Sequence, residues 1–407
     1  MKISGIICEY NPLHNGHIHH IQQVRQNGAD AVVAVMSGNF VQRGDVAVID
    51  KFTRANLAIS AGVDLVIELP VTHSLAPAEN FALGGVSILS ALGIVNEISF
   101  GSECGNVELL QEAANACRMC KTEYRDVMEG FLRDGYSYPD VLTRMVDTMC
   151  GSEIASVLLE PNNTLAIEYI NAMYTLECYM QPFTVKRKGA GHNSFLAPSP
   201  VSPDVNIASA TYIRNCFYTG DDCHHVMPSQ SWNALNKCEQ NGKIASIENL
   251  ERALLYRLRT TSVNELCDIA EVGQGLENRI IKAKNASSLD ELLETLRTKR
   301  YPLARIRRIL LHILLDIKSS DIRSLPPYGR VLAFNDMGRQ ILKITKGRRT
   351  LPFSHSLKEL SKSGQRAAHC AYLESKATDI YQLACENIGE TALDYKRKTT
   401  IAENLRT

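Results

Sequence analysis

The first hundred residues alternate between two hydrophobic periodicities. Short apolar runs of strand length occupy residues 3–8, 31–36, 65–69 and 97–101. They are nearly continuous, which is typical of strands buried on both faces of a sheet. Helix-like stretches lie between them, at roughly 17–27, 51–62 and 79–92. Strand followed by helix in this order predicts right-handed βαβ crossovers and a parallel, doubly wound α/β sheet.

Helical patterns dominate further along the chain. Residues 105–180 carry mostly helical patterns, and a fifth strand is predicted over 183–188. A short helix is expected over 208–217, and amphipathic helices follow from about residue 230. We therefore predict an α/β domain over 1–225, with a helical insertion at about 105–180. A mainly α-helical domain over 226–407 is expected to follow it.

Composition narrows the setting of the protein. The 407 residues carry 44 Lys and Arg and 44 Asp and Glu, so nucleic-acid binding would need a local basic surface. The first apolar run is too short for a signal peptide, and no run reaches the roughly 18–20 apolar residues of a membrane-spanning helix. We expect a cytoplasmic protein without membrane contact, whose 12 cysteines are reduced thiols.

Two cysteine-containing segments are candidate metal sites. Cys117 and Cys120 form a C-x-x-C, and Cys223 is followed by His224 and His225. The paired spacing of a structural zinc site is missing, so no metal ligands are assigned.

The segment E-Y-N-P-L-H-N-G-H, over residues 9–17, carries the clearest chemical signal. It follows a buried strand at its carboxyl end, where ligands of open α/β sheets bind. His14 and His17 stand three residues apart at a helix start and can face the same spot, while Gly16 allows a phosphate to approach the backbone. Two imidazoles beside the positive end of a helix suit the charge that develops when an α-phosphate is attacked. The alternative is a pair of hydrogen-bonded surface histidines, because H-x-G-H also occurs by chance.

This segment resembles the H-x-G-H signature of the nucleotidyltransferase superfamily. Together with M-S-G-N-F-V-Q-R-G-D over residues 36–45, it is similar to the tRNA(Met) cytidine acetate ligase family. The resemblance runs over most of the chain and implies a nucleotidyltransferase domain that uses ATP and Mg²⁺. It implies that acetate is activated as acetyl-adenylate, which then acetylates N4 of the wobble cytidine of elongator tRNA(Met).

The resemblance also implies a set of ATP contacts. Around the first strand they are Ile7, Cys8, Glu9, Tyr10, Asn11, Pro12, Leu13, His14, Asn15, Gly16, His17 and His20. Further along they are Gly101, Asn162, Arg187 and Lys188. Without the resemblance, the later residues could belong to a strand-ending turn, an N-cap and a solvated basic pair.

A-S-A-T-Y-I-R over residues 208–214 matches the second superfamily signature, I-S-S-T-x-x-R, with Ala210 in place of the second serine. Ser209 and Thr211 can cap the following helix, whose N-terminus would face the β- and γ-phosphates. Arg214 can neutralise the departing pyrophosphate, so it joins His14 and His17 as a predicted catalytic residue. A capped helix without a ligand is the alternative.

Polar residues after the second strand are candidates for the acetate pocket. They are Ser37, Asn39, Gln42 and Arg43, in a glycine-flanked segment at the carboxyl edge of the sheet. Arg43 could hold an anion through paired donors. The alternative is a capped turn leading into the next helix.

Residues 296–308 form a basic cluster without an acidic residue. Helical periodicity places Arg305, Arg308 and His312 opposite the apolar face, and Tyr301 offers a stacking surface for an unpaired base. The predicted RNA contacts are Arg297, Lys299, Arg300, Tyr301, Arg305 and Arg308. A solvated helix face is the alternative.

Two other functions compete with the acetate ligase. A cofactor adenylyltransferase that joins ATP to a phosphorylated small molecule would explain both signatures but not the helical half. An RNA-binding protein with a vestigial nucleotide fold would explain only the basic cluster. ATP–pyrophosphate exchange distinguishes the three functions. It would depend on acetate in the ligase and on a phosphorylated metabolite in the adenylyltransferase, and it would not occur in the RNA-binding protein.

Overall fold

The computed structural model describes residues 1–187, 199–202, 205–273, 275–298, 301–397 and 400–401. The predicted ATP contact Lys188 and the predicted RNA contacts Lys299 and Arg300 lie outside these residues.

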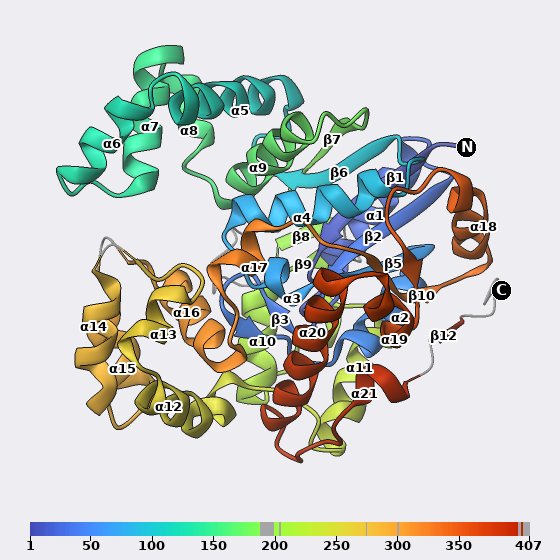
Figure 1. The fold of residues 1–407 in the computed structure, drawn as a ribbon. Coiled ribbons are helices and arrows are strands. Elements are labelled where there is room, and N and C mark those ends of the chain that lie inside the picture. Colours follow the sequence, from blue (N-terminus) through green and yellow to red (C-terminus); the bar gives the residue numbers. More distant parts are fainter. Residues whose placement is uncertain (188–198, 203–204, 274, 299–300, 398–399, 402–407) are drawn as a thin grey trace.

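A largely parallel sheet forms the centre of the molecule, in the order β11-β10-β5-β2-β1-β6-β7 (Figure 1). The five strands expected from the sequence are β1 (Ile3–Cys8), β2 (Ala31–Ser37), β5 (Leu65–Leu69), β6 (Glu97–Ser102) and β7 (Gln181–Lys186). They are parallel neighbours, and every residue of β1, β2 and β5 is buried. The continuous apolar runs therefore arise from strands covered on both faces, which confirms the predicted doubly wound α/β architecture.

Helices cover both faces of this sheet. Alternate residues of β1, such as Ile3 and Ile7, pack on α4 (Ala78–Ala91) and α9 (Pro161–Thr175). Ile6, which precedes Ile7 and points to the opposite face, packs with α1 (Asn15–Gln26) and α2 (Lys51–Ser60). The period of two along a strand thus divides its side chains between two cores.

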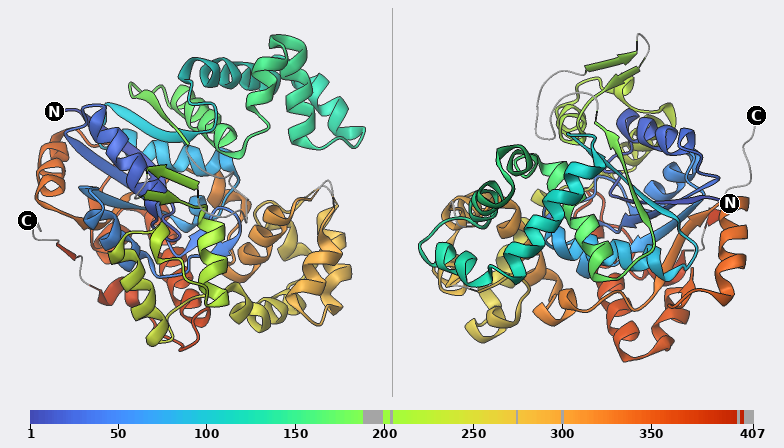
Figure 2. Two further views of the ribbon diagram at one scale, coloured as in Figure 1. Left: turned by 180° about the vertical axis from the view of Figure 1, so that it is seen from behind. Right: turned by 90° about the horizontal axis from the view of Figure 1, so that it is seen from above.

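The expected helical insertion is also present. It consists of α5 (Val107–Thr122), α6 (Arg125–Arg133), α7 (Tyr138–Cys150), α8 (Ser152–Val157) and then α9. Figures 1 and 2 show that α6–α8 project from the same side of the sheet as the later helices α12–α16.

The second half of the chain is mainly helical, as predicted. Its helices are α10 (Ala210–Thr219), α11 (Ser229–Gln240), α12 (Glu251–Thr260), α13 (Val263–Asp268), α14 (Leu276–Lys282), α15 (Leu289–Leu296), α16 (Leu303–Leu315), α17 (Ser319–Arg323), α18 (Asp336–Ile344), α19 (Leu357–Leu360), α20 (Gln365–Leu383) and α21 (Leu393–Lys396). Shorter elements in the first two hundred or so residues are β3 (Phe40–Val41), β4 (Asp45–Val46), α3 (Val71–Ser74), β8 (Ser199–Ser202) and β9 (Val205–Ile207).

The sheet does not end with the first 225 residues. β10 (Gly329–Phe334) pairs antiparallel with β5, and β11 (Phe353–Ser354) and β12 (Thr400–Ile401) pair with β10. Sequence patterns missed these strands because two of them have only two residues and β10 lies between helices. The predicted boundary near residue 225 therefore marks a change from mixed strand and helix patterns to mainly helical ones. The central sheet itself contains strands from both sides of this boundary.

A buried cluster of five charges joins the C-terminal region to the sheet. Lys51 Nζ lies 2.5 Å from Glu68 Oε1, 2.9 Å from Asp394 Oδ1 and 3.7 Å from Glu374 Oε2. Arg330 Nη1 lies 3.1 Å from Glu68 Oε2 and 2.5 Å from Asp394 Oδ1. We call this group the interior charge cluster, and it connects α2, β5, β10, α20 and α21.

No helix among the described residues is both long and apolar enough to cross a membrane.

Candidate active site

The first signature lies where β1 turns into α1. His14 is the N-cap of α1, and its Nδ1 accepts a hydrogen bond from the Gly16 N–H at 3.0 Å. His17 Nδ1 accepts from the His14 N–H at 3.2 Å, and the two rings lie with centroids 3.8 Å apart and planes tilted by 31°. Because both Nδ1 atoms accept, each neutral imidazole carries its proton on Nε2. The cap thus fixes the tautomer in which both histidines can donate a hydrogen bond through Nε2.

The ends of β1 and β2 are held together by Arg54. Its buried guanidinium donates to the carbonyl oxygens of Glu9, at 2.6 Å, and of Ser37, at 3.1 Å, as well as to that of Gly38. These carbonyls end the two strands, and a single side chain satisfies them. Sequence reasoning missed Arg54, because an arginine on α2 has no local signal for such a role.

The β3–β4 hairpin packs beside the first signature. Glu9 Oε1 accepts from the Gln42 N–H at 2.8 Å, and burial raises the pKa of the Glu9 carboxyl. Burial also lowers the pKa of the neighbouring Arg43 guanidinium, an effect that the charge of Glu9 opposes. Gln42 and Arg43, two of the four acetate candidates, line the cavity described below.

The other two acetate candidates lie away from this cavity. Ser37 and Asn39 are buried and do not line the cavity. Asn39 Oδ1 accepts from the Lys51 N–H at 2.9 Å, and its Nδ2 donates to Thr378 Oγ1 at 3.3 Å. Asn39 therefore caps a turn and contacts α20, which is the alternative that the sequence left open.

The second signature meets the first across the carboxyl edge of the sheet. Ser209 is the N-cap of α10 and accepts from the Tyr212 N–H at 3.1 Å. Arg214 Nη1 donates to the Asn11 carbonyl at 2.8 Å, and its Nη2 donates to Thr211 Oγ1 at 3.3 Å. Two segments about two hundred residues apart thus place the N-termini of α1 and α10 on one cavity.

Asn162 and Arg187 also reach this cavity. Glu103 accepts from the backbone N–H groups of Asn162, at 3.3 Å, and of Asn163, at 2.9 Å, which fixes the start of α9. Gly101 does not line the cavity. A Cβ added there would lie 3.3 Å from Cγ of Arg187, so glycine leaves room for this arginine to cross the strand.

Five other predicted ATP contacts do not line the cavity: Pro12, Leu13, Asn15, Gly16 and His20. Gly16 donates its backbone N–H to His14, which does line the cavity. Asn15 Nδ2 donates to the carbonyls of Asn206 and His225. His20 Nε2 pairs with Ser99 Oγ on β6 at 2.8 Å, and burial lowers the pKa of its imidazole to about 4.

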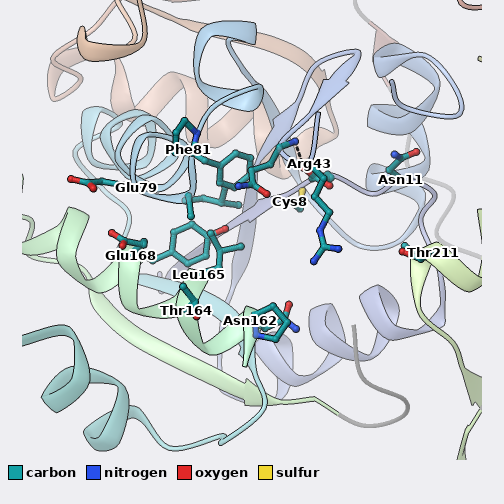
Figure 3. A pocket seen from close by; sticks show the side chains of 18 of the residues that line it. Cys8, Asn11, Arg43, Glu79, Phe81, Asn162, Thr164, Leu165, Glu168 and Thr211 are labelled. Carbon is teal, nitrogen blue, oxygen red and sulfur yellow. Dashed lines mark hydrogen bonds between the residues drawn. The ribbon is translucent and has the colours of Figure 1, made fainter. Parts of the chain in front are cut away.

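The cavity has a volume of about 690 Å³ and two halves of different character (Figure 3). One half, which we call the motif half, is formed by the ends of β1, α1, α9 and α10 and the β3–β4 hairpin. Its lining comprises Ile7, Cys8, Glu9, Tyr10, Asn11, His14, His17, Gln42, Arg43, Asn162, Arg187, Ser209, Ala210, Thr211, Arg214 and Arg308.

The other half, which we call the helical half, lies between α4, α7 and α9. Its lining comprises Pro77, Ala78, Glu79, Phe81, Tyr138, Pro139, Leu142, Thr143, Leu158, Pro161, Thr164, Leu165, Glu168 and Tyr169. The sequence predicted none of these residues, because they come from three separate helices and form no local motif.

Comparison with known proteins agrees with this geometry. The model of the family described as HIGH Nucleotidyl Transferase matches residues 1–396. A protein of Alkaliphilus metalliredigens called tRNA(Met) cytidine acetate ligase is 36% identical over 409 residues, which is 95% of each chain. One of the same name from Clostridium novyi is 37% identical over 86% of this chain and 89% of its own. The chain belongs to the tRNA(Met) cytidine acetate ligase family.

Solved structures of this family have the same fold. Apo TmcAL of Thermotoga maritima matches with a TM-score of 0.92 and 30% identity, over 99% of this chain and 100% of its own. TmcAL of the same organism bound with alpha-thio ATP matches with a TM-score of 0.91 and 29% identity over the same shares. The predicted family and the nucleotidyltransferase-type α/β fold are thereby confirmed.

In this family member, the basic helix does not present the face that periodicity predicted. Arg308 is buried and forms two 2.6 Å hydrogen bonds to the Glu271 carboxylate, while its Nη1 donates to the Gln42 carbonyl at 3.2 Å. His312 is also buried and pairs with the Leu75 carbonyl at 2.6 Å. Both sides of α16 are therefore covered, because the face opposite its apolar stripe packs on the β3–β4 hairpin and α3. Gly44 allows this contact, since a Cβ there would lie 2.5 Å from the backbone nitrogen of Arg308.

The remaining basic candidates differ in exposure. Tyr301 is buried, and the Arg305 guanidinium lies over its ring at 5.5 Å, so the ring is not presented as an open stacking surface. Arg297, at the end of α15, is exposed. Of the predicted RNA contacts that the structure describes, Arg297 thus fits the prediction best.

The structure places the two cysteine segments in different surroundings. Cys117 and Cys120 lie on the buried face of α5, and all twelve cysteines are free. Cys223 is buried, whereas Asp222, His224 and His225 are exposed with one potential ligand atom each within 4.8 Å of one another. Asp222 Oδ1 already pairs with His224 Nδ1 at 2.6 Å.

Proposed function

We propose that this protein uses ATP to activate acetate as acetyl-adenylate and then acetylates N4 of the wobble cytidine of elongator tRNA(Met). The observation that carries the proposal is the meeting of both nucleotidyltransferase signatures on one cavity, in a chain whose relatives are called tRNA(Met) cytidine acetate ligases. TmcAL bound with alpha-thio ATP supports ATP as the nucleotide.

The motif half would hold the triphosphate. The N-termini of α1 and α10 face it, and Arg43 on the β3–β4 hairpin and Arg214 on α10 add positive charge. Arg214 is fixed by the Asn11 carbonyl and the Thr211 hydroxyl, so its guanidinium is held in place before the substrate binds. Such preorganised donors stabilise a charged transition state without reorganising.

The first half-reaction joins acetate to AMP. An acetate oxygen attacks the α-phosphorus, a new O–P bond forms, and the bond to pyrophosphate breaks. The Nε2–H groups of His14 and His17 would donate to the phosphoryl oxygens as negative charge grows there. Arg214 would balance the charge of the leaving pyrophosphate. No covalent intermediate with the enzyme is required.

The second half-reaction transfers the acetyl group. The cytidine N4 attacks the acyl carbon, an N–C bond forms, and the C–O bond to AMP breaks. One proton leaves the nitrogen to water, and AMP is released. Positioning of the two reactants would account for much of the rate.

Mg²⁺ is expected to accompany ATP. The one carboxylate among the motif-half residues is Glu9, and it already accepts from the Gln42 N–H with a pKa raised by burial. These residues do not fit a resident Mg²⁺ site, for which oxygen ligands would be needed. The ion would therefore be carried by the phosphates.

Acetate-dependent ATP–pyrophosphate exchange, followed by transfer of labelled acetate to elongator tRNA(Met), tests the proposal. We expect exchange only with acetate and label only on tRNA that carries the wobble cytidine. Exchange that needs a phosphorylated metabolite would indicate the adenylyltransferase alternative. RNA binding without any exchange would indicate a vestigial nucleotide site.

A further inference from the structure

The two halves of the cavity carry opposite charge. In the motif half, the lining residues Arg43, Arg187, Arg214 and Arg308 outnumber the single carboxylate of Glu9, although Arg308 is paired with Glu271 outside the lining. In the helical half, the charged lining residues are Glu79 and Glu168. A ligand that spans both halves must therefore change from anionic to hydrogen-donating along its length.

Both carboxylates of the helical half, Glu79 and Glu168, pair with Lys121, which does not itself line the cavity. Lys121 Nζ lies 3.0 Å from Glu79 Oε2 and 3.5 Å from Glu168 Oε1. Burial raises the pKa of Glu168, an effect that the Lys121 charge opposes. Two carboxylates and one ammonium leave this half with a net negative charge when all three are ionised. Acetate and the phosphates of ATP would be repelled from it.

The remaining lining is apolar and aromatic. Phe81 on α4 and Tyr169 on α9 are buried, and Leu142 and Leu165 complete the wall. Tyr138 is 40% exposed. Such a slot suits a flat, uncharged ring with a hydrogen-bond donor at its edge.

We propose that the helical half binds the acceptor cytosine, with its exocyclic amine directed at Glu168. This inference rests on the proposed acetyl transfer. A carboxylate that accepts from N4 is a known way to read cytosine, and RNA bases that enter proteins are splayed out against aromatic side chains. N4 has two hydrogens, so Glu168 can hold one while the nitrogen faces the acyl group in the motif half.

The location favours this occupant. The helical half is continuous with the place where acetyl-adenylate would form, so the amine meets the acyl group without leaving the cavity. The insertion helices α6–α8 and the helices α12–α16 project on the same side of the sheet (Figures 1 and 2). A loop of RNA could therefore reach Tyr138 and Glu79 from solvent, where Glu79 is 63% exposed.

The test compares base preferences in Glu168→Gln, which keeps the shape of the side chain and removes its charge. Binding is measured for the anticodon stem-loop with cytidine or with uridine at the wobble position, because uridine lacks the amine. A hydrogen bond to a charged group corresponds to about a tenfold preference or more, so we expect the cytidine preference of the unaltered enzyme to fall about tenfold in this variant. Glu160→Gln, an exposed position just before α9, is the matched control and should keep the preference.

A second measurement identifies the other base that could fill the slot. Adenine also carries an exocyclic amine, so the preference for ATP over GTP in pyrophosphate exchange is measured on the same variants. Loss of the ATP preference in Glu168→Gln would overturn the proposal and assign the helical half to adenine. An unchanged cytidine preference in a variant with an unaltered melting temperature would also overturn it. Should Glu168→Gln fail to fold, Leu165→Phe, which narrows the slot, takes its place. This variant must weaken the binding of the cytidine-containing stem-loop more than that of the uridine-containing one. Failure of the unaltered enzyme to acetylate tRNA would refute the proposed function itself.

Discussion

Arg214 in the cavity and Lys51 in the interior charge cluster are both held firmly, but by different kinds of partner. Arg214 donates to a backbone carbonyl and a hydroxyl, which position it without neutralising its charge. Lys51 is paired with carboxylates and is 1% exposed. A charge that must act on a ligand is oriented by dipoles, whereas a charge that holds the fold is cancelled by its opposite. The kind of partner therefore indicates the purpose of a buried charge better than burial does.

Removal of Lys51 should have the largest effect on stability. Lys51→Met would leave three carboxylates facing only Arg330, and breaking a buried pair in this way costs about 3–5 kcal/mol. Urea unfolding measures the loss. Lys396→Met is the control, because its partner Glu390 is exposed and such pairs contribute about 0–1 kcal/mol. Similar losses in both variants would show that the cluster is not a structural anchor.

Removal of either signature histidine should have the largest effect on activity. His14→Ala and His17→Ala are each expected to lower acetate-dependent exchange by about 10²–10³-fold, as for loss of one oxyanion donor. His14 also caps α1, so part of any effect could come from the helix. His14→Asn separates the two roles, because asparagine is a good N-cap but lacks the Nε2 donor. Its melting temperature should be close to that of the unaltered protein while its activity stays low.

Arg214→Ala tests whether a charge oriented by dipoles acts on the leaving group. We expect exchange to fall by about 10–100-fold, as for a hydrogen bond to a charged group, with AMP affinity nearly unchanged. Arg214→Lys should recover part of the rate only, because an ammonium lacks the planar fork. Equal losses of AMP and ATP affinity would instead mean that Arg214 supports α10.

The cluster should also make stability depend on pH. Burial opposes ionisation of Asp394, but Lys51 and Arg330 outweigh it and lower the pKa of Asp394 to about 2 from its ordinary 3.8. A lowered pKa contributes stability above about pH 4, and this contribution is lost as the pH falls toward 2. Glu374, whose pKa burial raises, acts in the opposite sense at higher pH. Unfolding free energies between pH 5 and 2.5 should therefore fall less steeply in Asp394→Asn.

The smallest expected effect concerns the surface. Arg297→Glu should weaken tRNA binding and reduce the slope of log affinity against log salt by about 0.7–0.9, the value for one phosphate contact. Arg259→Glu, on α12, is a control whose arginine donates to the carbonyls of Lys284 and Ala286. An unchanged slope in Arg297→Glu would remove this residue from the RNA-binding surface.

Periodicity and the two signatures predicted the central strands, the insertion and the motif half of the cavity. They worked because β1 is buried throughout and because His14, His17 and Arg214 belong to local motifs. The exposure of Arg308 was predicted wrongly, since periodicity identifies one apolar face but does not reveal that a second element covers the other. Tyr301 precedes α16 and was predicted only from its place in the basic cluster, which does not reveal its burial. Asn39 resembled a ligand contact because turn caps and anion sites use the same polar residues. The helical half could not be predicted, because it exists only where three distant helices meet.

The antiparallel strand β10 has a consequence for synthesis on the ribosome. Its neighbour β5 is an apolar strand that emerges with residue 69, whereas β10 is not complete until residue 334 and Asp394 follows later still. At roughly 5–20 residues per second, the nascent chain carries an open sheet edge for tens of seconds, and during this time Lys51 and Glu68 lack Arg330 and Asp394. An exposed edge of this kind pairs readily with other chains. Release of a shortened chain that ends near residue 225 would therefore yield an aggregation-prone product, although both nucleotide signatures would already be present.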